Sequence, residues 1–299
     1  MAHWFLSTRV QAIGGSAKEV SVLDADRPGA TEDLLAELKA EVEGRDVFFA
    51  THGFEVDQPT GITELGAWLG NLQIGNAVKI GILWPGDAAL KLFVDYIVEG
   101  REAIQSGDFL SDFLNDNFAG AVSLSFASHS LGARTVLQTI SGLADGIRVR
   151  RVLLMAGAID NDCLVNEYKA AANKSEEISL LASAGDDVLS FAFPLGNPLM
   201  GIIDRWHPYY RAALGHKGPA QPFPGSPPLQ SNWQIPAEWG YGHHDYLQDG
   251  SLPPGATFPL PLDIPASGVP RPPVGAPAGL GGDTWKPAWS AGFASTRFK

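Results

Sequence analysis

The chain has 299 residues, a hydrophobic fraction of 45% and a formal net charge of −12 at pH 7. This length and apolar content suffice for one large domain with a full core, with or without appendages. An acidic chain lacks the basic footprint that phosphate binding requires, so neither nucleic acid nor an anionic membrane surface is expected as a partner.

The single cysteine, Cys163, excludes an intrachain disulfide, so the fold does not depend on an oxidising compartment. The opening residues 1–9 lack a basic segment followed by a long apolar run, and no stretch of the chain is long enough to span a bilayer. We therefore expect a cytoplasmic protein without stable membrane insertion, while secretion by another route stays open.

Strands and helices alternate along the first part of the chain. Two short runs around Gly14-Gly15 predict an opening hairpin. Apolar runs then predict strands at 46–50, 78–84, 121–127, 151–157 and 178–184, and periodicity predicts helices at 31–42, 62–72, 133–140 and 163–173. This pattern is typical of a doubly wound, mostly parallel sheet with helices on both faces, whose sites lie beyond the carboxyl ends of the strands.

Two further segments surround this pattern. Residues 88–118 carry helical periodicity with a predicted break near 106–108, and we interpret 86–118 as ordinary sheet cover or as a helical insertion or lid. About half of residues 253–282 are proline or glycine, a composition typical of extended structure. We expect one α/β domain over 1–250 and an extended arm over 251–299. The arm's aromatic anchors would pack on the domain or on a second subunit of a homo-oligomer; they are Trp285, Trp289, Phe293 and Phe298.

The most informative motif is Ser128-His129-Ser130-Leu131-Gly132, which joins a predicted buried strand to a predicted helix. A serine in such a turn has the geometry of a nucleophile elbow, which lifts the hydroxyl clear of the sheet at a helix N-terminus. Backbone N–H groups there stabilise developing negative charge. Ser128 replaces the usual first glycine of this motif, and the plain alternative for Ser130 is a helix-capping turn serine.

A serine nucleophile needs a histidine base that is oriented by a carboxylate, in the chain order Ser, acid, His. Asp186 and Asp187 follow the strand at 178–184, and His243 and His244 lie beyond them. Either aspartate and either histidine satisfies this order. We expect His129 and Trp84 to line the substrate pocket, and we assign His52 no proton-transfer role.

Five stretches together resemble the α/β-hydrolase superfamily over about residues 45 to 250, within it a bacterial group of esterase-like serine hydrolases. They are His52-Gly53-Phe54, Trp84-Pro85, the elbow at 128–132, Asp186-Asp187-Val188-Leu189 and His243-His244-Asp245-Tyr246.

The resemblance implies an ester-cleaving hydrolase with Ser130 as nucleophile, Asp186 as acid and His243 as base. It also implies an oxyanion hole formed by the backbone N–H groups of Phe54 and Leu131.

The expected substrate is a small-molecule ester or a lipid. A lipase or acyltransferase acting on lipids is one alternative, and a hydrolase fold retained as a non-catalytic binding module is another. His243, His244 and Asp245, joined by His129 or His207, contain metal-ligand side chains. However, adjacent residues rarely face one ion, so no metal is expected. The chain lacks phosphate-loop and dinucleotide motifs, so no cofactor is expected.

Overall fold

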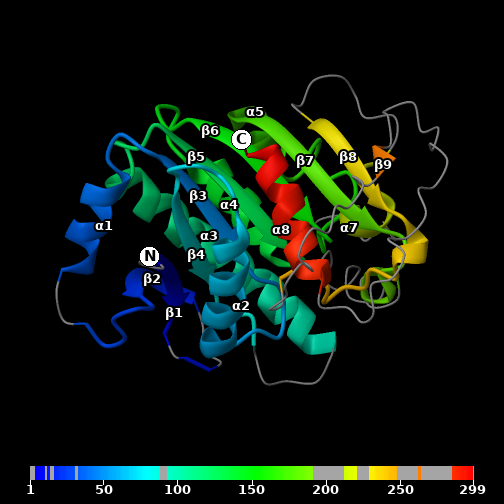
Figure 1. The fold of residues 1–299 in the computed structure, drawn as a ribbon, viewed down its shortest axis with the longest axis horizontal. Helices are drawn as coiled ribbons and strands as arrows, with labels where there is room; N and C mark the ends of the chain where they lie inside the picture. The colour runs from blue at the N-terminus through cyan, green and yellow to red at the C-terminus, as the bar shows by residue number, and fades with distance from the viewer. Residues whose placement is uncertain are drawn as a thin grey trace.

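The fold was determined from a computed structural model, which describes residues 4–10, 12–13, 17–30, 33–87, 93–190, 212–220, 229–247, 262–263 and 285–298. These residues form a nine-stranded sheet of order β2-β1-β4-β3-β5-β6-β7-β8-β9 (Figure 1). The strands are β1 (Trp4–Arg9), β2 (Ala17–Asp24), β3 (Asp46–Thr51), β4 (Val78–Leu83), β5 (Ser123–His129), β6 (Val149–Met155), β7 (Ser175–Ser183), β8 (Leu229–Ile235) and β9 (Leu262–Asp263).

Only the two edge pairs of this sheet, β1–β2 and β8–β9, are antiparallel. The other neighbours run parallel. The predicted doubly wound, mostly parallel sheet and its opening hairpin are therefore confirmed. The sequence did not predict β8 or β9, which extend the sheet beyond β7.

Helices cover both faces of the sheet. They are α1 (Leu34–Val42), α2 (Gln58–Asn71), α3 (Phe93–Asn117), α4 (Gly132–Gly142), α5 (Lys169–Lys174), α7 (Leu214–Lys217), the 3-10 helix η1 (Ala237–Trp239) and α8 (Trp285–Arg297). Side chains of β3 alternate between two cores, because successive residues of a strand point to opposite faces. Phe48 packs in the core that α2 and α8 cover, and Phe49 in the core that α1, α3, α4 and α5 cover. Figure 1 shows α2 and α8 in front of the sheet.

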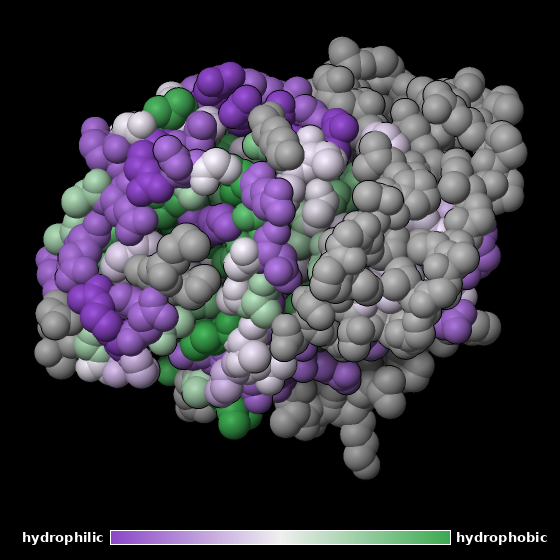
Figure 2. Space-filling view, in the orientation of Figure 1, coloured by the Kyte–Doolittle hydropathy of each residue, from purple (hydrophilic) through white to green (hydrophobic). Residues whose placement is uncertain are grey.

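The helices on these faces are amphipathic where they meet solvent. In α1, Leu38 and Val42 are buried while Glu37 and Lys39 are exposed. The left side of Figure 2, over α1, is accordingly hydrophilic. None of the helices in the described part of the chain is long and apolar enough to cross a membrane.

Helix α3 corrects the predicted break near residues 106–108, because it runs without interruption through Gly107. A Cβ at Gly107 would lie 2.5 Å from the Gln138 Cβ and 2.9 Å from the Thr135 carbonyl oxygen. The glycine therefore lets α3 pack closely against α4 instead of ending a helix. Of the predicted insertion, residues 88–92 lie outside the described residues.

Two other predicted boundaries also differ. The helix expected at 163–173 is regular only over α5, because residues 162–168 form successive turns, among them Cys163 N–H to the Asp160 carbonyl. The arm expected to be extended over 251–299 contains β9 and ends in helix α8, in which Pro287 lies in the first turn, where its missing N–H costs nothing. All four predicted anchors are buried, namely Trp285, Trp289, Phe293 and Phe298. The rest of the arm lies outside the described residues.

Candidate active site

Ser130 lies in a strained turn between β5 and α4. Its φ is +53°, a left-handed conformation that is uncommon for a residue with a side chain. The turn is fixed by the Ser130 N–H, which donates to the Met155 carbonyl at 3.0 Å. The Ser130 carbonyl accepts from Ala133 N–H and Ala158 N–H, both at 3.1 Å. This geometry matches the predicted elbow between strand and helix.

The Ser130 hydroxyl is the first member of an unbroken hydrogen-bonded chain. Its Oγ lies 2.7 Å from His243 Nε2, and His243 Nδ1 lies 2.7 Å from Asp186 Oδ2. Since Asp186 is an acceptor, Nδ1 carries the imidazole proton and Nε2 is free to accept the proton of Ser130. All three side chains are buried, Asp186 completely. The structure thus brings together three residues that span 113 positions of the sequence.

The same geometry distinguishes Asp186 from Asp187 and His243 from His244. The second carboxyl oxygen of Asp186, Oδ1, also accepts a hydrogen bond, from the Leu189 N–H at 2.9 Å. Asp187 and His244, the competing aspartate and histidine, are exposed to solvent. Of the two histidines, His243 bonds Ser130, and of the two aspartates, Asp186 bonds His243.

The predicted oxyanion donors belong to two turns pressed against each other. A Cβ at Gly53 would lie 2.8 Å from the Ser130 Cβ and 3.0 Å from His129 Nδ1, so only glycine fits beside the elbow. Within the described ranges, the N–H groups of Phe54 and Leu131 have no hydrogen-bond partner. Neither amide is therefore committed to another group of the described chain, which an oxyanion donor requires.

His52 and Trp84 brace the turn that carries Phe54. His52 Nδ1–H donates to the Gly53 carbonyl at 2.8 Å, and Nε2 accepts the Trp84 N–H at 3.3 Å. The Trp84 indole N–H donates to the His52 carbonyl at 3.0 Å, and the two rings stack. Burial lowers the pKa of His52 to about 4, so the ring is neutral. Trp84 is fully buried among the described residues, and its role in lining the substrate pocket stays a prediction.

Arg9 reinforces this turn from the neighbouring strand β1. Its guanidinium donates to the Trp84 carbonyl at 2.7 Å and to the Val56 carbonyl at 3.2 Å, and it pairs with Asp87. Sequence analysis missed this residue, because an arginine at the end of a predicted edge hairpin carries no pattern that indicates a site.

His129 contacts the main chain of His243. Its Nε2–H donates to the backbone carbonyl of His243 at 2.7 Å, and only 8% of the residue is exposed. Burial and the nearby His243 lower the pKa of His129 well below its usual value, so it stays neutral. His129 therefore supports the main chain of His243, and its role in lining the substrate pocket stays a prediction.

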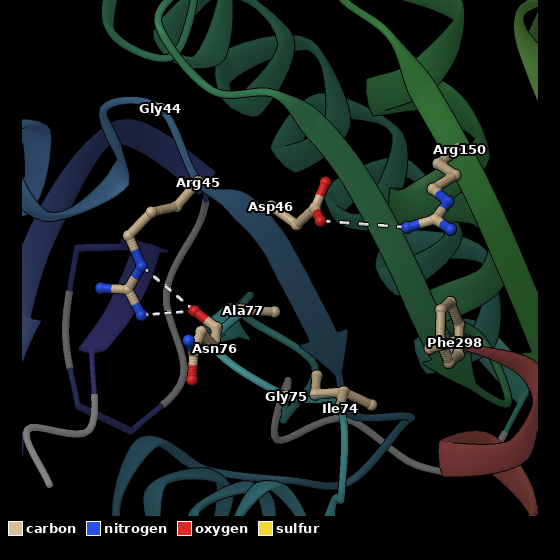
Figure 3. A pocket seen from close by; sticks show the side chains of 9 residues that line it. All are labelled: Gly44, Arg45, Asp46, Ile74, Gly75, Asn76, Ala77, Arg150 and Phe298. Carbon is tan, nitrogen blue, oxygen red and sulfur yellow. Dashed lines mark hydrogen bonds and ion pairs between the residues drawn. The ribbon is translucent and has the colours of Figure 1, made fainter.

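A hollow lies at the opposite edge of the sheet, at the amino ends of β3, β4 and β6 (Figure 3). Its volume is about 660 Å³, and it is lined by Gly44, Arg45, Asp46, Ile74, Gly75, Asn76, Ala77, Arg150 and Phe298. Arg150 Nη1 and Asp46 Oδ2 are 3.9 Å apart, and both side chains are at least a third exposed. Two N–H groups of Arg45, on Nε and Nη2, donate to the Asn76 carbonyl. Among the described residues, no group of three His, Cys, Asp or Glu side chains is placed to hold a metal ion.

A family model described as an alpha/beta hydrolase of unknown function (DUF900) matches residues 27–221. The matched stretch includes Ser130 and Asp186 and ends before His243. No curated protein matches the chain.

Proposed function

The chain belongs to the alpha/beta-hydrolase family of unknown function that this model describes, and we propose that it cleaves carboxylic esters through an acyl-enzyme on Ser130. The observation that carries the proposal is the hydrogen-bonded chain from Ser130 through His243 to Asp186, with 2.7 Å at each step. Nucleophile, base and orienting carboxylate within hydrogen-bond reach of one another are the arrangement that serine acyl transfer requires.

In the first half of the proposed reaction, His243 Nε2 takes the proton of Ser130 as Oγ attacks the ester carbonyl carbon. The carbonyl oxygen becomes an oxyanion, to which the Phe54 and Leu131 N–H groups donate. Such a donor typically contributes about 3 kcal/mol to transition-state stabilisation. The tetrahedral intermediate then collapses, the alcohol leaves with the proton held by His243, and an acyl-Ser130 ester remains.

In the second half, a water molecule replaces the alcohol. His243 takes a proton from the water, and its oxygen attacks the acyl carbon. Collapse of the second tetrahedral intermediate breaks the bond to Ser130 Oγ, which recovers its proton from His243, and the carboxylic acid leaves. Both halves use water and protein groups alone.

Asp186 serves this cycle by its position. It fixes the tautomer in which Nε2 is the acceptor, and its negative charge stabilises the imidazolium that forms in each half-reaction. The carboxylate is completely buried and bonded through both oxygens, so it needs no reorganisation while charge develops.

The proposal is tested by turnover of short p-nitrophenyl esters by wild type and Ser130→Ala. We expect the variant to lose at least about a thousandfold in kcat/KM. Ser125→Ala is the matched control, because it removes a buried hydroxyl from the same strand away from the site. Undiminished turnover in Ser130→Ala would refute the proposal.

The same assay separates the alternative functions. Activity that rises sharply when the ester is presented in micelles would indicate a lipid substrate. A wild-type protein that turns over no ester and leaves Ser130 unreactive towards a fluorophosphonate would indicate a binding module.

A further inference from the structure

The loop that carries His243 is fastened to the C-terminal helix α8, more than 40 positions further along the chain. We define this histidine loop as residues 240–246. We propose that Lys286, in the first turn of α8, is the positioning residue that holds the histidine loop so that His243 faces Ser130. The inference rests on the proposed function, because it concerns the alignment of the same base.

Lys286 bonds to the histidine loop on both sides of His243. Its Nζ donates to the Gly240 carbonyl at 2.7 Å and to Asp245 Oδ2 at 2.7 Å. The same Asp245 oxygen accepts the Gly242 N–H at 2.7 Å, so it closes the loop upon itself. The Lys286 ammonium therefore joins the start and the end of the loop through one charge.

The burial of Lys286 makes these bonds obligatory. Only 3% of the residue is exposed, and its side chain also lies over the Tyr241 ring. A lysine is almost never buried to this extent unless it is paired, because removing its charge from water costs several kcal/mol. An ammonium in such a place contributes more to specifying one conformation than to net stability.

Further contacts tie α8 to the same loop. The Tyr241 hydroxyl donates to the Lys286 carbonyl at 2.5 Å, and the Ser290 hydroxyl donates to the Tyr246 carbonyl at 2.6 Å. Ser290 in turn accepts the Trp68 indole N–H at 2.9 Å, which connects the helix to α2. The histidine loop thus rests on a helix that is itself fixed to the body of the domain.

Aromatic packing makes this support rigid. Trp289 meets Trp239 and Tyr241 in edge-to-face contacts with ring centroids 5.1 and 5.7 Å apart. Trp285 meets the same two rings at 5.9 and 6.1 Å. Because buried aromatic side chains have few rotamers, these ring contacts restrict the position of the histidine loop relative to α8.

The bonds of Lys286 that carry the inference go to the histidine loop on either side of His243, so its effect on the reaction passes through the position of that loop. Without the ammonium, Gly240 and Asp245 lose their common partner and the histidine loop relaxes. The His243 Nε2 to Ser130 Oγ alignment then loosens, and a misplacement of about 1 Å can cost a hundredfold in rate. The loss should fall on kcat, since Lys286 is not among the residues predicted to line the substrate pocket, His129 and Trp84.

The test compares Lys286→Met with Lys174→Met. Lys174 is the matched control, because its ammonium also bonds two acceptors, the Ser141 and Leu143 carbonyls, but lies at the far end of α4. We expect Lys286→Met to reduce kcat on p-nitrophenyl esters and the rate of fluorophosphonate labelling by roughly tenfold to a hundredfold, with KM changed by less than about threefold. Lys174→Met should keep wild-type rates even where its Tm falls.

Equal labelling rates in Lys286→Met and wild type would overturn the inference, and so would an equal loss of rate in Lys174→Met at the same loss of Tm. Should Lys286→Met fail to fold, Asp245→Asn removes only the charge of the partner, and unchanged kcat and labelling rates there would overturn the inference.

An unreactive wild-type Ser130 would instead refute the proposed function. The positioning role is then decided by the downfield proton resonance of His243 Nδ1–H bonded to Asp186. We expect it in wild type and in Lys174→Met, and we expect it to be lost or broadened in Lys286→Met. Its retention in Lys286→Met would overturn the inference.

Discussion

The two edges of the parallel sheet differ in kind. At the carboxyl edge, Ser130, His243 and Asp186 are buried and bonded in series at 2.7 Å. At the amino edge, a hollow of about 660 Å³ is open, but its charged side chains are half-exposed and loosely paired or bonded to the backbone. The difference teaches why we assign the proposed chemistry to the carboxyl edge: its groups are preorganised, whereas the amino edge offers only the size of a hollow.

Strained backbone conformations lie at the carboxyl edge of the sheet. Glu55, Ser130 and Ala156 are the described non-glycine residues with positive φ, and they follow β3, β5 and β6, which are neighbours in the sheet. Strained residues persist only where the surrounding structure fixes them, and they cluster at functional sites. At the amino edge, the positive φ values of the lining residues belong to Gly44 and Gly75, for which this conformation costs little.

The largest effect after loss of the nucleophile should come from Asp186→Asn. The amide keeps the size of the side chain but can donate to Nδ1, which favours the wrong tautomer of His243. We expect kcat on p-nitrophenyl esters to fall by about a thousandfold to ten-thousandfold. Asp187→Asn is the control, since that neighbouring side chain is exposed. A loss of less than tenfold in Asp186→Asn would contradict the assignment of the proposed reaction to the carboxyl edge.

An intermediate effect should appear in the dependence of stability on pH. The folded-state pKa of His52 is lowered by burial to about 4, whereas an exposed histidine titrates near 6.5. Between these values the unfolded chain binds more protons, so the free energy of unfolding falls as the pH drops from about 6.5 towards 4. His52 alone should account for roughly 3 kcal/mol of this loss at pH 4.

Urea unfolding of wild type and His52→Asn at pH 7 and pH 4 measures this contribution. The difference in unfolding free energy between the two pH values should be smaller in the variant by that amount. An identical difference in both proteins would show that the buried charge-sensitive groups of the carboxyl edge do not include His52.

The smallest effect should follow Arg150→Ala at the amino edge. Its ion pair with Asp46 is long and solvated, so the change in unfolding free energy should stay below about 1 kcal/mol. The kcat/KM for esters should equal that of wild type. A loss of ester turnover would show that the two edges are coupled, which would break the contrast between them.

Much of this organisation could be predicted from the sequence. Nearly continuous apolar strands separated by amphipathic helices fix a parallel sheet, and such a sheet gathers its strand ends at one edge. The elbow around Ser130 and the order of acid and histidine narrowed the candidates to two aspartates and two histidines, and the family resemblance then selected Asp186 and His243. Local pattern and chain order thus indicate the place of the site, and the motif decides within each pair.

The remaining features depend on tertiary contacts that no local pattern encodes. Gly107 resembles a helix break, although it lets α3 approach α4 closely. The bond from the Trp84 indole N–H to the His52 carbonyl joins two turns that follow different strands. Lys286 lies beyond a proline-rich stretch, and nothing in its surroundings indicates that it reaches the histidine loop. Long-range packing decides each of these positions.

The central claim is that Ser130 is an activated nucleophile at the carboxyl edge. Its most direct test is reaction of the folded wild-type protein with a fluorophosphonate, followed by intact-mass measurement and peptide mapping. The account predicts a single covalent adduct located on Ser130, absent from Ser130→Ala and after denaturation before labelling. An unmodified wild-type protein, or an adduct that persists in Ser130→Ala, would contradict it.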